Sequence, residues 1–317
     1  MKKIYEFLLW NNCSNNCTFC HQRAHERRIN DKILTPDEQI ESLKLCKEFL
    51  NTQFEKGNHI LLVGGEIFDI RNDKPKKALI DLIKHIKNMM CNDEIDLLYI
   101  NTNLLYEDIG LLDWFLTLLD TNGLIERIKF TTSYDMIGRF TNKEREFLFY
   151  KNLKYLTDTY ANIHIVVNTV LTDTACKRIQ EDMFAADYLI EYLKNQGKTS
   201  WTMKQWMDYF KVDVNTIPYI KLDSELAPEM PTRSTVFNTL IHLDKQISGY
   251  LKRYADNIAL KQEKDLYEYN KSKKQFVFCS SELDKDCGHS VNFHRCFVDS
   301  DKCFPCEIVK LSETIKD

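Results

Sequence analysis

The sequence predicts an α/β protein in which parallel strands form a partial (β/α)6 barrel, followed by a C-terminal helical and cysteine-rich extension. Short apolar, β-rich runs alternate along the chain with longer amphipathic segments, an order typical of β/α units around a parallel sheet. With 44% hydrophobic and 28% charged residues, the 317-residue chain has the composition of a folded protein with a large core.

Six apolar runs are the expected strands: residues 4–10, 59–63, 95–100, 127–132, 162–171 and 218–222. Successive parallel strands joined by right-handed helical crossovers wind into either an open doubly wound sheet or a barrel, and six units make an incomplete barrel. In both arrangements the functional site lies at the carboxyl ends of the strands.

Helix-start signals separate these runs. Thr35-Pro36-Asp37-Glu38 supplies an N-cap, a proline and a capping glutamate, which predicts a helix running to about Glu55. Thr141-Asn142-Lys143-Glu144 repeats the signal for a helix ending near Tyr160. Helical periodicity also covers 75–89 and 109–120, and segment 174–212 is long enough for two helices. Its large side chains are expected in the core: Trp201, Met203, Trp206 and Met207.

Two domains are expected, with residues 1–228 forming the barrel and residues 229–317 forming the extension. The second part begins after Pro228 and Pro231 with a mixed-charge helix, roughly Ser234 to Tyr269, and ends in a cysteine-rich tail.

Composition also limits the partners. A net charge of -4 and a pI near 6.1 give no global attraction to nucleic acid or anionic lipid. No stretch reaches the roughly 18 apolar residues needed to cross a bilayer, so we expect a cytoplasmic protein without a membrane partner. The chain holds eleven cysteines and no export signal, which favours thiols kept free for metal or catalysis.

Three of these cysteines directly follow the first expected strand, as Cys13, Cys17 and Cys20. Iron-sulfur clusters are held by cysteine thiolates, and three ligands on a four-iron cluster leave one iron open to an exogenous ligand. The alternative is half of a zinc site, with a fourth ligand such as His21.

This CxxxCxxC spacing, with aromatic Phe19 before the last cysteine, resembles the signature of the radical S-adenosylmethionine superfamily. The second strand ends in Gly64-Gly65-Glu66, which resembles the family's GGE motif. The resemblance implies a 4Fe-4S cluster on the three cysteines, S-adenosylmethionine on its open iron, Phe19 beside adenine, and Gly64, Gly65 and Glu66 at the methionine amino group.

Further polar residues follow later strands. Ser133, within Thr131-Thr132-Ser133-Tyr134-Asp135 and followed by Arg139, looks like the segment of peptide-modifying members that meets the cofactor's ribose or carboxylate. Asn103 and Asn168 occupy corresponding strand ends and are candidate cofactor contacts, although such residues are commonly turn or cap residues.

The family's chemistry implies reductive cleavage of S-adenosylmethionine to a 5'-deoxyadenosyl radical, which abstracts a substrate hydrogen. It also implies a one-electron donor such as flavodoxin or ferredoxin. A peptide or protein side chain is the expected substrate, and a nucleoside or nucleic-acid base is the alternative. From another class of function, a non-catalytic zinc-binding scaffold remains open.

The last forty residues carry a second group of cysteines, namely Cys279, Cys287, Cys296, Cys303 and Cys306. Four of them suffice for a tetrahedral zinc site or an auxiliary iron-sulfur cluster, and the spacing does not separate the two. The tail lacks the CxxCxxxC run of the usual auxiliary domain of peptide-modifying members.

Overall fold

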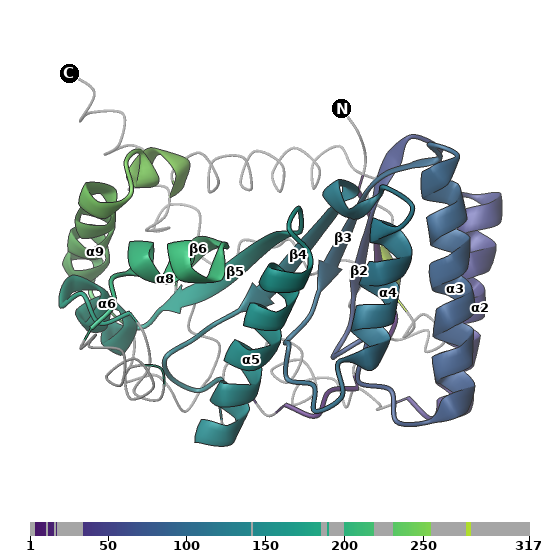
Figure 1. The fold of residues 1–317 in the computed structure, drawn as a ribbon, viewed down its shortest axis with the longest axis horizontal. Coiled ribbons are helices and arrows are strands. Elements are labelled where there is room, and N and C mark those ends of the chain that lie inside the picture. The colour runs from purple at the N-terminus through teal and green to yellow at the C-terminus, as the bar shows by residue number, and fades with distance from the viewer. Residues whose placement is uncertain are drawn as a thin grey trace.

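The computed structural model describes residues 4–10, 12–15, 17, 34–140, 142–184, 189, 200–218, 231–254 and 277–279. Its centre is a sheet in the order β6-β5-β4-β3-β2-β1-β7, in which all neighbouring strands are parallel (Figure 1). The strands are β1 (Ile4–Leu8), β2 (Asn58–Val63), β3 (Ile95–Asn101), β4 (Ile128–Ser133), β5 (His164–Leu171), β6 (Asp213–Pro218) and β7 (Val277–Cys279).

Helices connect these strands along the chain, and α4 and α5 pass in front of the sheet in Figure 1. The described helical elements are α2 (Pro36–Thr52), α3 (Asp73–Cys91), α4 (Gly110–Asp120), the 3-10 turn η1 (Ile125–Arg127), α5 (Lys143–Thr159), α6 (Asp173–Gln180), α8 (Met203–Phe210) and α9 (Arg233–Gln246). The order from β1 to β6 never reverses, whereas a doubly wound sheet reverses at a switch point. The α/β class and the parallel sheet are confirmed.

The two faces of the sheet differ in character. Along β4, Ile128, Phe130 and Thr132 are buried, while the residues between them are half-buried, and β5 alternates in the same way after its first residue. Strands covered on both faces read instead as continuous apolar runs. At β4 and β5 the sheet therefore has one face packed into the core and a second, more polar face that water partly reaches, whereas on β1 the consecutive residues Tyr5, Glu6 and Phe7 are all buried.

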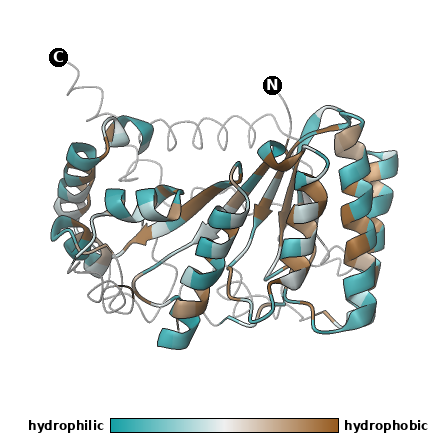
Figure 2. Cartoon of the chain, in the orientation of Figure 1, coloured by the Kyte–Doolittle hydropathy of each residue, from teal (hydrophilic) through white to brown (hydrophobic). Residues whose placement is uncertain are grey.

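The packed face joins one large core, and Figure 2 shows hydrophobic residues along the strands and polar residues on the outer sides of the helices. As expected, the stripe in segment 174–212 is core: Trp201, Met203 and Trp206 are almost fully buried. The Trp206 ring stacks on Tyr134 at the end of β4, with centroids 5.4 Å apart.

The capping box at Thr35 is present, and its helix α2 ends at Thr52. At α5 the N-cap is Asn142, whose side chain accepts from the Arg145 amide; Thr141 lies outside the described residues.

Two element predictions are wrong. The sixth described strand is Asp213–Pro218, so it begins five residues before the expected strand at 218–222, of which residues 219–222 lie outside the described residues. The expected continuous helix from Ser234 to Tyr269 is interrupted, because α9 ends at Gln246 and Gly249 then adopts a left-handed φ of 74°. That conformation costs a glycine little and ends a regular helix.

The expected boundary at 228/229 lies outside the described residues. Beyond it, α9 packs against α6, where Gln180 donates to Thr239 Oγ1 at 2.7 Å and His242 lies 2.8 Å from Asp182. Among the described residues, no helix has the combination of length and apolar character that a bilayer crossing requires.

Candidate functional site

The residues singled out in the sequence meet at the carboxyl edge of the sheet wherever the structure describes them. Cys13 and Cys17 follow β1, Gly64 to Glu66 follow β2, and Asn103 follows β3. Ser133 on β4 and Asn168 on β5 are register partners at the same edge. Phe19, Cys20, Cys287, Cys296, Cys303 and Cys306 lie outside the described residues.

A buried asparagine within the cysteine loop, Asn15, makes most of the loop's described hydrogen bonds to the two cysteines. The Asn15 carboxamide donates to Cys17 Sγ at 2.9 Å and to the Arg139 carbonyl oxygen at 3.2 Å. The backbone N–H of Asn15 donates to Cys13 Sγ at 3.4 Å. Cys17 is buried and Cys13 is exposed. The loop is thus tied to the segment after β4 and directs amide donors at both sulfur atoms.

The turn after β2 is bonded to the base of this loop. Gly65 N donates to the Trp10 carbonyl oxygen at 2.7 Å, and Glu66 N donates to the Asn12 carbonyl oxygen at 2.8 Å. The Trp10 indole returns a hydrogen bond to the Glu66 carbonyl oxygen at 3.1 Å. A Cβ on Gly64 would lie 2.9 Å from the Trp10 oxygen, so glycine is required for this approach.

The Glu66 carboxylate points into the protein, where it is almost fully buried. It accepts hydrogen bonds from the hydroxyls of Thr102 and Tyr106 and, at 2.6 Å, from the backbone N–H of Asn103. Desolvation raises the pKa of Glu66 to about 7 in spite of these donors. The Glu66 side chain therefore binds the residues that follow β3. At the site, the Gly64–Glu66 turn presents its backbone and not the Glu66 carboxylate.

Asn103 links the Glu66 carboxylate to the cysteine loop. Its Oδ1 accepts from Leu105 N at 2.8 Å, closing a local turn. Its Nδ2 donates to Cys13 Sγ at 3.5 Å. Asn103 was predicted as a cofactor contact, and the structure gives its amide a partner on the cysteine loop.

A buried ion pair lies beside the loop, on the segment after β4. Asp135 accepts from Val170 N at 2.7 Å, and its second carboxylate oxygen lies 3.9 Å from Arg139 Nη1. Burial raises the pKa of Asp135 to about 6, and the Arg139 charge opposes the rise. Arg139 Nε and Asp135 Oδ2 are both buried, and neither has a hydrogen-bond partner among the described residues. A buried donor of this kind favours a bound anionic or polar group.

The donor set fits an iron-sulfur cluster on the atoms described. Two thiols share one strand-end loop, and amide N–H groups point at both sulfurs, as suits thiolate ligands of a cluster. The third expected ligand, Cys20, is not described. Within the described part of the chain, no three metal-binding side chains form a group. For the second expected metal site, Cys279 ends β7 opposite Leu8 of β1, so that segment reaches the same edge.

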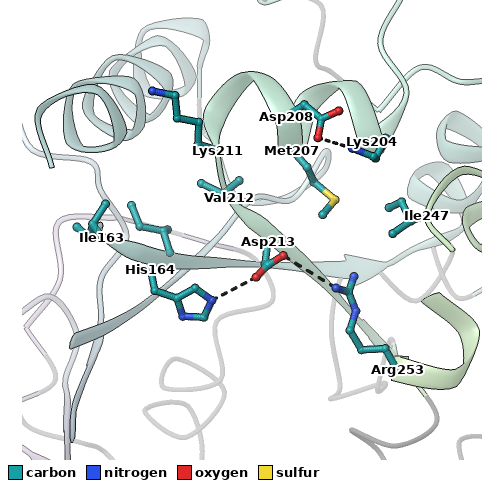
Figure 3. Close-up of a pocket in the computed structure, with 11 residues that line it drawn as sticks. Ile163, His164, Lys204, Met207, Asp208, Lys211, Val212, Asp213, Ile247 and Arg253 are labelled. Carbon is teal, nitrogen blue, oxygen red and sulfur yellow. Dashed lines mark hydrogen bonds and ion pairs between the residues drawn. The ribbon is translucent and has the colours of Figure 1, made fainter. Parts of the chain in front are cut away.

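A pocket of about 500 Å³ opens at the other end of the sheet, beside the first residues of β5 and β6 (Figure 3). His164 Nε2 lies 3.2 Å from Asp213, and Arg253 lies 3.9 Å from the same carboxylate. Lys204 pairs with Asp208 on the opposite wall. These charged side chains pair with one another. The pocket is separate from the cysteine-loop site because it lies at the amino edge of the sheet.

Sequence reasoning did not assign Asn15, Tyr106 or Arg139 to the site. The position of Asn15 between two of the clustered cysteines was the one sequence signal that could have pointed to it. Nothing in the sequence indicates its contact with Arg139, because the two residues lie 124 positions apart. No family model and no curated protein matches this chain. Function is therefore inferred from the residues of the site.

Proposed function

We propose that this chain is a radical S-adenosylmethionine enzyme with a partial β/α barrel. The observation that carries the proposal is the hydrogen-bonded assembly at one sheet edge of the Cys13–Cys17 loop, the Gly64–Glu66 turn and Asn103. The unreversed strand order supports a singly wound barrel, because right-handed crossovers in one direction keep the helices on one face. The more polar second face would then line the barrel interior.

Cys13, Cys17 and Cys20 would hold the cluster. The backbone of Gly64 and Gly65 would approach the methionine amino group, and Phe19, Ser133 and Asn168 would contact the rest of the cofactor. When bound, the cluster would supply one electron for reductive cleavage of S-adenosylmethionine, and the resulting 5'-deoxyadenosyl radical would abstract a substrate hydrogen. The protein's own contribution is to bind, orient and exclude water.

Arg139 adds a cation to this set. It is buried, it lies on the segment bonded to the cysteine loop, and its Nε has no hydrogen-bond partner among the described residues. An anionic group placed there would gain a charge-assisted hydrogen bond in a site of low dielectric constant. We assign Arg139 to the cofactor carboxylate, with Ser133 as its partner at the ribose or carboxylate.

For the tail, we propose a second metal site made by four of Cys279, Cys287, Cys296, Cys303 and Cys306, either an auxiliary iron-sulfur cluster or zinc. The parallel pairing of β7 with β1 supports a position near the first site. The proposed substrate is a peptide or protein side chain, the electron donor a flavodoxin or ferredoxin, and the location the cytoplasm. A nucleoside or nucleic-acid base is the second candidate substrate.

Anaerobic reconstitution of the full chain tests the proposal. We expect iron and sulfide in the purified protein, and 5'-deoxyadenosine when S-adenosylmethionine and a strong reductant are added. Cys17→Ala should abolish both, whereas Cys91→Ala, at an exposed cysteine on α3, should abolish neither. About four irons per chain would match one cluster and about eight would match two. Bound zinc with no iron and no 5'-deoxyadenosine would instead support the non-catalytic scaffold.

A further inference from the structure

We infer that the side-chain amides of Asn103 and Asn15 set the reduction potential of the proposed cluster by donating to Cys13 and Cys17, and that Glu66 positions Asn103 for this role. The inference rests on the proposed function, since it needs the cluster. It adds a role for Asn15, which the sequence analysis did not assign, and for Asn103 and Glu66, which were predicted to contact the cofactor.

Both cysteine sulfurs that the structure describes receive amide donors. Cys13 Sγ receives Asn103 Nδ2 at 3.5 Å and Asn15 N at 3.4 Å, and Cys17 Sγ receives Asn15 Nδ2 at 2.9 Å. Asn15 and Asn103 are both at least nine-tenths buried. Water competes little for these buried amide groups. The bond to the buried Cys17 acts in a medium of low dielectric constant, whereas the two bonds to Cys13 end at an exposed residue.

Asn103 is held at its other polar atoms, which leaves Nδ2 aimed at the sulfur. Its backbone N–H is fixed by Glu66 Oε2 at 2.6 Å, and its Oδ1 accepts from Leu105 N at 2.8 Å. The Glu66 carboxylate is in turn held by the hydroxyls of Thr102 and Tyr106. Glu66 is therefore a positioning residue that acts on the cluster through Asn103.

Hydrogen bonds to cluster sulfurs are one of the levers that set the potential of an iron-sulfur protein. Reduction adds an electron and makes the thiolates more negative, so an N–H donor stabilises the reduced form more than the oxidised form. Removing the donor should lower the reduction potential. The cluster would then be harder to reduce, with no change in its ligands.

The test is a redox titration of the reconstituted full-length protein, monitored by the electron paramagnetic resonance signal of the reduced cluster. Asn103→Asp keeps the oxygen that accepts from Leu105 and removes the amide donor. We expect the ratio of reduced to oxidised cluster at a fixed potential to fall about tenfold, which for a one-electron couple is about 59 mV. Asn101→Asp controls for an added negative charge at an exposed site two residues away. Asn103→Leu, which removes the amide donor without adding a charge, should also lower the potential and separates the lost hydrogen bond from the added charge.

Two more variants separate the parts of the inference. Asn15→Asp removes the donor to Cys17 and should lower the potential in the same direction. Glu66→Gln keeps the Asn103 side chain and should lower the potential by less than Asn103→Asp, because it loosens the donor without deleting it. Should Asn103→Asp fail to take up iron, the Asn15→Asp titration decides the question.

The outcomes are distinct from those for the proposed function. A wild-type protein that takes up no iron would refute the proposed cluster itself. A wild-type protein with a reducible cluster, whose Asn103→Asp and Asn15→Asp variants titrate no lower than Asn101→Asp, would overturn the inference and leave the proposed function standing.

Discussion

Replacing Glu66 with glutamine should remove a loss of stability that the wild-type chain suffers as pH rises. Burial raises the pKa of Glu66 from 4.5 to about 7. Between those pH values the folded chain binds more protons than the unfolded chain, so stability falls as pH increases. The contribution is complete below about pH 4.5 and is lost as pH rises through about 7. Its full size is about 3 kcal/mol, and most of it is lost between pH 5 and pH 8.

Urea unfolding of the full chain at pH 5, 6, 7 and 8, followed by circular dichroism, measures this effect. The Glu66→Gln variant has its own cost, because its amide group meets surrounding donors, so the quantity to compare is the change with pH. The free energy of unfolding of the wild type minus that of the variant should decrease by about 2–3 kcal/mol from pH 5 to pH 8. Glu48→Gln, at an exposed position on α2, controls for removal of a carboxylate. A constant difference between wild type and Glu66→Gln would refute the reasoning.

Three further substitutions test the Gly64 turn, the packing of the core and the hydrogen bonds to Glu66. Gly64→Ala places a Cβ 2.9 Å from the Trp10 carbonyl oxygen and should lower the iron content after reconstitution. Gly57→Ala, which strains a left-handed φ of 79° just before β2 but has no atom within 4 Å of the added Cβ, should keep the wild-type iron content; equal iron contents in the two variants would contradict this prediction. Trp206→Ala should cost about 3–5 kcal/mol in urea unfolding because the ring is fully buried, and an unchanged midpoint would refute that. Tyr106→Phe removes a donor to the Glu66 carboxylate and should move its pH-dependent loss of stability to higher pH, which the same pH series would detect.

Local signals predicted much of the fold. The capping box at Thr35 fixes the start of α2, and apolar runs placed β1 to β5 within a few residues. The sixth strand was misplaced because Asp213–Pro218 mixes polar and apolar residues, with Val214 and Thr216 buried against the core. The strand order required pairing between distant segments, which periodicity does not contain.

For the candidate site too, part could be predicted from the sequence and part could not. Its strand-end motifs could be predicted because the carboxyl ends of parallel strands share one edge. The inward turn of the Glu66 carboxylate could not, because it depends on Tyr106, which lies 40 positions away. The link between Asn103 and Cys13 joins residues 90 positions apart and depends on how β3 meets the cysteine loop.

The pairing of β7 with β1 also has a consequence for synthesis. Val277 lies opposite Glu6, so the sheet cannot be completed until 271 further residues have followed the first strand. At about 5–20 residues per second, ribosomal elongation over that interval takes on the order of tens of seconds. Throughout that time one edge of β1 lacks its partner, and unpaired edges are sites of aggregation. This last pairing, which occurs beside the cysteine loop, can therefore form only after nearly the whole chain has been made.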